Sequence, residues 1–281
     1  MFMFASAYGL ARLHQCRLYV SSKILTELRR YFIMEPLNNL ITDIAVSKLS
    51  GIQRMYSVCT FFSELMLPNA IKYLEIEGYW QAYGHFAKHN EELRQLFNGK
   101  QETIQRLSTF FSQSLQIIRR HYGCTPKENI SFKFSTHEQI KKALMLTNFT
   151  WIGIHIRRTD FILNKHVSSD SYVLEGIKYF SRKYEKSIFI VASDDKLYCS
   201  NLLKNQVNVI VTPDLFSAID DLISLGICQH SIVTGGSFGW WAAFLANGDA
   251  LHDVQYDSLR KGCNCTKEWY YPPWFLLPSK V

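Results

Sequence analysis

Two adjacent arginines followed by a carboxylate give the clearest chemical signal in this sequence. Arg157 and Arg158 come directly after the apolar run at residues 151–156, and Asp160 follows two positions later. Arginine keeps its proton, so two neighbouring guanidinium groups are costly to bury unless an anion meets them. A diphosphate would suit them. The simpler alternative is a surface ion pair between Arg158 and Asp160, but the position after an apolar run favours the diphosphate.

A glycine-rich turn offers a second anion site. Residues 234–239 read Thr-Gly-Gly-Ser-Phe-Gly and separate a short apolar run from an apolar helical segment. Gly236 permits close backbone approach, Ser237 can cap the helix, and free N–H groups in a first helical turn, such as that of Phe238, bind anions. Together with the arginines, this turn predicts a nucleotide diphosphate held from two sides. The G-x-G-x-x-G pattern does not follow the first apolar run, which disfavours a nicotinamide dinucleotide.

Two acidic pairs are further candidates. Asp220 and Asp221 begin a predicted helix, where acidic residues ordinarily complement the helix dipole. The functional alternative is that one of them accepts two hydrogen bonds from the N1 and N2 edge of guanine. Asp194 and Asp195 resemble half of a metal-binding D-x-D motif with the wrong spacing, so we favour helix capping or a ribose contact for them.

The elements that would position these residues alternate along the second half of the chain. Short apolar runs separated by helical patterns predict right-handed βαβ units and a doubly wound parallel sheet. Ligands of such sheets bind beyond the carboxyl ends of the strands, which is where the candidate residues fall. The expected strands are 151–156, 187–192, 207–211 and 231–233, and the expected helices are 170–184, 196–204, 216–228 and 238–246.

The first half of the chain is mostly helical in pattern. Apolar residues at helical spacing run through 90–122, with Gly99 as a break. The aromatic residues around Trp80 are either an acceptor platform or, more simply, a packing stripe. The change in texture predicts two domains, at 1–146 and at 147–281, with the nucleotide diphosphate expected in the second.

Composition excludes several classes of protein. The chain has 281 residues and a formal charge of +7, but no long basic run, so no nucleic-acid partner is expected. Its seven cysteines and nine histidines lack zinc spacing, so no metal is expected. No stretch reaches the roughly 18 apolar residues of a membrane helix, so membrane association would need an anchor outside this chain. Sequons at Asn129, Asn148 and Asn264 hint weakly at a secretory protein.

The sequence resembles the α-1,2-fucosyltransferases over nearly its whole length. The strings at 155–160 and 236–245 are similar to that family's H-x-R-R-x-D and G-(T/S)-F-G-x-W-A-A motifs, with shorter matches at 78–81 and 271–274. The resemblance implies two facing Rossmann-like domains of the GT-B kind, and GDP-fucose as the donor without a required metal or other cofactor. It also implies inversion at the fucose, a terminal β-galactoside as the acceptor, and the lumenal side of the Golgi membrane as the location.

The resemblance also implies roles for individual residues. Arg157 matches the arginine that contacts phosphate, with Arg158 supporting it, and Asp160 is our candidate for the general base. The remaining positions fall into three groups: His155 and Asp221 as guanine contacts; Gly236, Ser237 and the Phe238 N–H at the β-phosphate; and Tyr79 and Trp80 on the acceptor side.

The beginning of the chain departs from the family pattern. Residues 1–11 resemble a helix that, in this family, follows a strand and a Gly-rich turn, and neither is present here. We therefore expect the amino-terminal domain to lack its first strand, as in a truncated gene product. The alternative function is a catalytically defective relative that binds GDP-sugar or glycan without transferring fucose.

Overall fold

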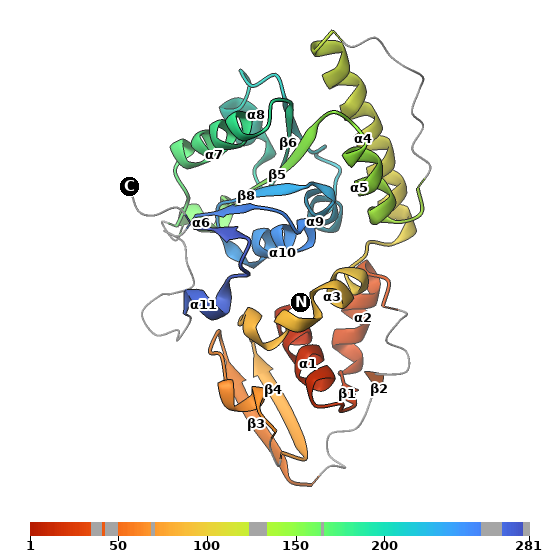
Figure 1. The fold of residues 1–281 in the computed structure, drawn as a ribbon, viewed down its shortest axis with the longest axis vertical. Coiled ribbons are helices and arrows are strands. Elements are labelled where there is room, and N and C mark those ends of the chain that lie inside the picture. The colour runs from red at the N-terminus through yellow and green to blue at the C-terminus, as the bar shows by residue number, and fades with distance from the viewer. Residues whose placement is uncertain are drawn as a thin grey trace. The chain divides into compact units, whose positions relative to one another are not determined.

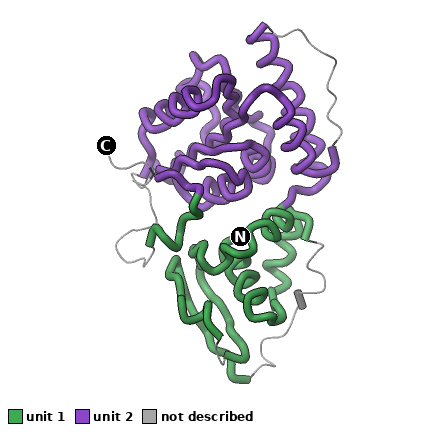
Figure 2. Tube along the Cα trace, in the orientation of Figure 1, with its two compact units in different colours: residues 1–97, 258–273 green, residues 98–257, 274–281 purple. Residues whose placement is uncertain are grey.

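The computed structural model describes residues 1–34, 41–42, 50–68, 71–123, 134–163, 166–253 and 266–277. The chain divides into two compact units, each treated by itself below (Figure 2). Unit 1 comprises Met1–Phe97 and Ser258–Pro273, and unit 2 comprises Asn98–Asp257 and Trp274–Val281.

The core of unit 2 is a sheet of six parallel strands (Figure 1). Its order is β10-β9-β8-β5-β6-β7, so β5 lies in the middle, between β8 and β6. This confirms the predicted α/β class with a parallel sheet, and it adds two strands, β9 and β10, that the sequence pattern did not reveal. The strands are β5 (Thr150–Ile156), β6 (Ser187–Ser193), β7 (Val209–Val211), β8 (His230–Val233), β9 (Ala250–His252) and β10 (Phe275–Leu276).

Helices cover both faces of this sheet. Alternate residues of β5 point to opposite faces: Ile152, Ile154 and Ile156 join a buried cluster with α7 and α8, whereas Gly153 faces Leu225 of α9. Helix α10 packs beside α9 and against β5 and β8. The helices are α6 (Thr159–Leu163), α7 (Asp170–Lys183), α8 (Lys196–Leu202), α9 (Ala218–Ile227) and α10 (Gly236–Ala246).

The border between the units differs from the domain border expected from the sequence. Helices α4 (Gln101–His121) and α5 (His137–Met145) belong to unit 2, because both pack against α9. The sequence placed these helices in the domain 1–146, since their helical pattern continues that of the preceding residues. Helical periodicity says which face of a helix is buried, but it does not say which core buries it.

Unit 1 contains helices and two pairs of parallel strands. β1 pairs with β2, and β3 pairs with β4 over six residues of each strand. Unit 1 also has a small buried core of Leu10, Leu65 and Trp80. The elements are α1 (Phe2–Leu13), β1 (Leu18–Tyr19), α2 (Ser22–Tyr31), β2 (Ile41–Thr42), β3 (Ile52–Ser57), η3 (Ser63–Met66), β4 (Tyr73–Gly78), η4 (Tyr83–His85), η5 (Ala87–His89), α3 (Asn90–Leu96) and α11 (Lys267–Tyr270).

Candidate functional site

The candidate residues after three neighbouring strands meet at the carboxyl edge of the sheet in unit 2. The backbone N–H of Arg157, after β5, donates to the Thr234 hydroxyl after β8 at 2.9 Å. The backbone N–H of Arg158 donates to Asp194, after β6, also at 2.9 Å. The segments that follow β5, β6 and β8 are thus tied together by hydrogen bonds, as the parallel arrangement of the strands requires.

Two carboxylates hold the Arg157 side chain. Its Nε lies 2.8 Å from Asp160 Oδ1, and its Nη1 lies 3.2 Å from Asp194 Oδ2. The side chain remains 35% exposed. A guanidinium has five N–H donors, so both partners leave donors for a ligand.

Arg158 points to different partners from those of Arg157. Its guanidinium carbon lies 3.3 Å from the centroid of the Tyr198 ring, and its Nε lies 3.5 Å from Asp195. The surface pair between Arg158 and Asp160, considered from the sequence, is absent from these contacts, because Asp160 pairs with Arg157. Arg158 therefore packs against α8, which fits a supporting role.

Asp194 joins the ends of β5 and β6. It accepts hydrogen bonds from the backbone N–H groups of Arg158 and Thr159 and from the Thr159 hydroxyl. Burial alone would raise the pKa of Asp194, but these hydrogen bonds and the charge of Arg157 outweigh it and lower the pKa. Asp194 thus stays ionised and orients Arg157, whereas Asp195 caps α8 by accepting from the Tyr198 N–H, as the capping prediction had it.

The amino end of α10 presents backbone N–H groups without a side-chain cap. The N-cap residue is Gly235 and makes no side-chain hydrogen bond, and Gly236 has a φ of +82°, a region that favours glycine. The prediction that Ser237 caps the helix is wrong, because Ser237 lies inside the first turn, where its side chain is exposed. The first-turn N–H groups are consequently available to an anion.

Phe161 connects the arginine to this helix end. The guanidinium carbon of Arg157 lies 5.7 Å from the Phe161 ring centroid. A Cβ placed on Gly236 would lie 3.4 Å from the same ring. Arg157 and the start of α10 therefore flank one phenyl ring, so the two groups predicted to share a diphosphate lie on one small patch of the sheet edge.

His155 lies beneath the first turn of α10. Its ring is 4.9 Å from that of Phe238 and only 4% of the residue is exposed. Burial lowers the pKa of His155 to about 3, so its imidazole is neutral at physiological pH. The ring positions the helix, and it offers little surface to a guanine.

The adjacent carboxylates at the start of α9 have different surroundings. Asp220 accepts from the Ser217 N–H and hydroxyl and pairs with Arg106 at 2.8 Å, forming a capping box. Asp221 pairs with Lys196 at 3.1 Å. Burial raises the pKa of Asp221, and Thr212 and Lys196 oppose this shift. The sequence did not single out Lys196, although its place just after β6 could have drawn attention to it.

The two residues predicted on the acceptor side, Tyr79 and Trp80 of unit 1, differ in how deeply they are buried. Trp80 is fully buried, and its indole N–H donates to the backbone carbonyl of Glu77. Its neighbours include Phe62 and His85, which fits the packing alternative. Tyr79 is 61% exposed and remains available to a ligand.

Of the sequons, Asn148 is exposed, and Asn129 and Asn264 lie outside the described residues.

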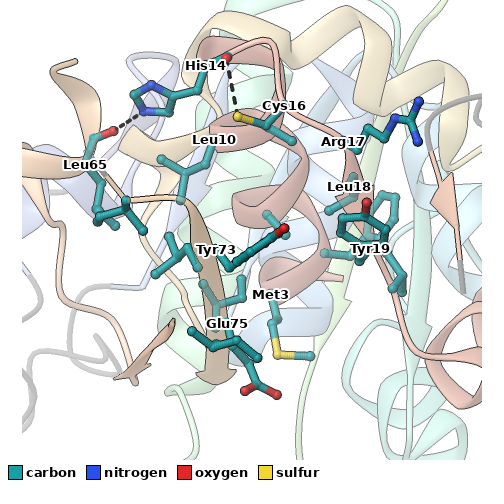
Figure 3. A pocket seen from close by; sticks show the side chains of 18 of the residues that line it. Met3, Leu10, His14, Cys16, Arg17, Leu18, Tyr19, Leu65, Tyr73 and Glu75 are labelled. Atoms are coloured by element: carbon teal, nitrogen blue, oxygen red, sulfur yellow. Dashed lines mark hydrogen bonds between the residues drawn. The ribbon is translucent and has the colours of Figure 1, made fainter. Parts of the chain in front are cut away.

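A cavity of about 730 Å³ lies within unit 1, between α1, β1 and β4 (Figure 3). Most of its lining is apolar, including Met3 and Leu10 of α1, and its polar neighbours include His14, whose Nε2 lies 2.7 Å from the Leu65 carbonyl. Figure 3 shows β4 and β1 on opposite sides of the cavity. Among the described residues, β1 pairs with β2 and β4 with β3.

The residues that the structure describes contain neither a metal-binding cluster of side chains nor a membrane-spanning helix. No group of three or more His, Cys, Asp or Glu side chains that could hold a metal ion occurs among them. None of their helices is both long and apolar enough to cross a bilayer.

Comparison with known proteins identifies relatives of the chain. The profile of Glycosyl transferase family 11 matches residues 65–274. Galactoside alpha-(1,2)-fucosyltransferase 1 from Sus scrofa is 29% identical over 147 residues, which are 45% of this chain and 40% of the pig protein. Galactoside alpha-(1,2)-fucosyltransferase 2 from Pongo pygmaeus is 33% identical over 116 residues, which are 38% of this chain and 34% of the relative. The matched part spans less than half the length of either relative.

A solved structure shows a weak likeness. FUT1 from Arabidopsis thaliana, determined as a mutant in complex with GDP, aligns with a TM-score of 0.46 at 13% identity. The alignment covers 91% of this chain and 68% of that chain.

Proposed function

Because this chain belongs to glycosyl transferase family 11, we propose that it transfers L-fucose from GDP-fucose to the 2-hydroxyl of a terminal β-galactoside, with inversion at the fucose. The observation that carries this proposal is the convergence of Arg157 and the uncapped start of α10 on Phe161. A guanidinium and a helix amino end on one patch suit a diphosphate. The names of the relatives supply the sugar and the linkage.

Transfer begins when the bond between the fucose anomeric carbon and the β-phosphate oxygen stretches. Negative charge grows on the departing GDP, and donors already aimed at that oxygen stabilise the transition state more than the ground state. We assign this role to Arg157, the N–H groups of Ser237 and Phe238, and the exposed Ser237 hydroxyl. These fixed donors do the work that a metal ion does in other transferases, so no metal is required.

The base that accepts the galactose 2-hydroxyl proton is assigned to Asp160. Its carboxylate is half exposed beside Arg157, within the segment that follows β5. The ion pair between Asp160 and Arg157 also gives Asp160 a positioning role. The two roles predict different pH dependence.

Replacing Asp160 with asparagine separates these roles. If Asp160 is the base, the asparagine variant loses the acidic limb of the kcat/KM profile, because no carboxyl remains to titrate, and turnover falls by about 10²- to 10⁴-fold. The measurement is a pH–rate profile with GDP-fucose and a β-galactoside, beside that of wild type. An intact acidic limb with reduced turnover would leave Asp160 as a positioning residue for Arg157.

The chain's compartment is proposed to be the lumen of the Golgi, where its acceptor glycans would be assembled. Cys59 is disulfide-bonded, and disulfides persist mainly in oxidising compartments. The sequon at Asn148 is exposed between α5 and β5, where an N-glycan can be attached.

The test combines binding with turnover on the same preparation. Calorimetry with GDP and with GDP-fucose should show binding, and incubation with GDP-fucose and a β-galactoside should yield an α-1,2-linked product. Binding without product would select the defective relative that holds GDP-sugar without transfer. Absence of GDP binding would overturn the donor site itself.

A further inference from the structure

Lys196 and Asp221 form a largely buried ion pair at the carboxyl edge of the sheet in unit 2. Lys196 begins α8 after the end of β6, and Asp221 lies in the first turn of α9. Nζ lies 3.1 Å from Asp221 Oδ2, with side chains 12% and 10% exposed. Nζ also donates to the Pro213 carbonyl at 2.7 Å. The proposed phosphate site uses neither residue.

The neighbouring carboxylate is already committed to other partners. Asp220 accepts from the Ser217 N–H, the Ser217 hydroxyl, and the Nε and Nη2 of Arg106. These four hydrogen bonds fill the roughly four acceptor positions of a carboxylate. Asp221 has two side-chain partners, Lys196 and Thr212, so of the two acidic residues it retains the capacity to accept from a ligand.

The ammonium group has capacity left as well. Lysine carries three N–H donors, and the Pro213 carbonyl and Asp221 take two of them. The ring of Phe216 lies 5.9 Å from Nζ, at the outer limit of a cation–π contact, and is partly exposed. The pair therefore presents one donor beside an acceptor, next to an aromatic ring on which a base could stack.

This pattern matches one nucleobase edge and opposes another. Guanine presents the O6 acceptor beside the N1–H and N2–H donors, whereas adenine presents the N6 donor beside the N1 acceptor. Resting on the proposed GDP-fucose donor and on the guanine contact already expected of Asp221, we infer that Lys196 donates a hydrogen bond to guanine O6 beside it. Lys196 is thus a specificity residue, and adenine would set donor against donor and acceptor against acceptor.

The experiment compares nucleotides that differ at one atom. Calorimetry on the full chain measures the Kd of GDP and of 6-thio-GDP, in which sulfur replaces O6 and accepts hydrogen bonds poorly. Wild type should bind GDP more tightly than 6-thio-GDP. Lys196→Met should weaken the binding of GDP by about 10- to 100-fold, because a charge-assisted hydrogen bond is lost. The ratio of the two affinities is the diagnostic readout, and Lys196→Met should bring it close to one. Lys196→Arg should retain the preference.

Two controls distinguish a loss of guanine recognition from structural damage to the protein. Lys183→Met removes a lysine that pairs with Asp249 elsewhere in unit 2, and it should leave both nucleotide affinities unchanged. Asp221→Asn should instead reduce the preference for GDP over IDP, because inosine lacks the N2 amine. Thermal unfolding of each variant checks that the chain is folded.

The outcomes distinguish this inference from the proposed function. Wild type that binds neither GDP nor GDP-fucose contradicts the proposed function. Wild type that binds GDP and 6-thio-GDP equally, or a Lys196→Met chain that keeps the full preference, overturns only the role of Lys196. The wild-type comparison needs no variant, so it remains decisive even if Lys196→Met does not fold.

Discussion

Replacing Arg157 with lysine is expected to lower kcat for fucose transfer by about 10²- to 10³-fold, the usual effect of losing one transition-state donor. In the folded chain, Nε and Nη1 of Arg157 contact two carboxylates, Asp160 and Asp194. A lysine ammonium is a single point charge and cannot span both partners while also presenting donors to the β-phosphate. The variant should still fold, because the replaced side chain is partly exposed.

The measurement is kcat and KM for GDP-fucose at saturating β-galactoside, together with the Kd of GDP. A matched control is Arg54→Lys, because Arg54 also pairs with a carboxylate, Glu75, on the surface of unit 1. This control should leave kcat unchanged. The assigned role concerns charge that develops in the transition state, so the loss should fall more on kcat than on GDP affinity. Turnover of Arg157→Lys close to wild type would place the stabilising donor elsewhere.

Replacing Gly239 with alanine is expected to displace the start of α10. A Cβ at this position would lie 2.4 Å from Val233 Cγ1 and 2.6 Å from His155 Nδ1. Both neighbours are buried, so the added methyl group should cost about 1 to 3 kcal/mol in the free energy of unfolding. The helix must also move away from the strands, and a shift of about 1 Å at a site can lower turnover about 100-fold.

Urea unfolding and GDP calorimetry test this prediction side by side. Gly51→Ala is the control, because a Cβ there meets nothing within 4 Å and Gly51 lies in unit 1. Its φ of +75° adds backbone strain of about 1 to 2 kcal/mol. Both variants should therefore be less stable, but only Gly239→Ala should lose GDP affinity. Unchanged GDP affinity in Gly239→Ala would show that the start of α10 is not part of the donor site.

Local patterns in the sequence determined four of the six strands of the sheet in unit 2 and much of its site. The alternation of apolar runs and helical segments predicted four parallel strands, and the structure contains all four as β5, β6, β7 and β8. The residues following those strands include Arg157 and Gly236, which the sequence singled out and the structure brings to one ring. Such features can be predicted from sequence because a strand buried on both faces and a tight turn each require particular residue types within a few adjacent positions.

The partners of the charged residues depended on the tertiary structure alone. Asp160 binds Arg157 rather than Arg158, and only three-dimensional contacts distinguish Asp220, which binds Arg106, from Asp221, which binds Lys196. The burial of Trp80 and the packing of α4 and α5 on α9 were decided in the same way. Sequence spacing limits which side chains share a face. The choice of partner depends on contacts in the folded chain, most of them between residues far apart in sequence, and on how fully each charge must be compensated once water is removed.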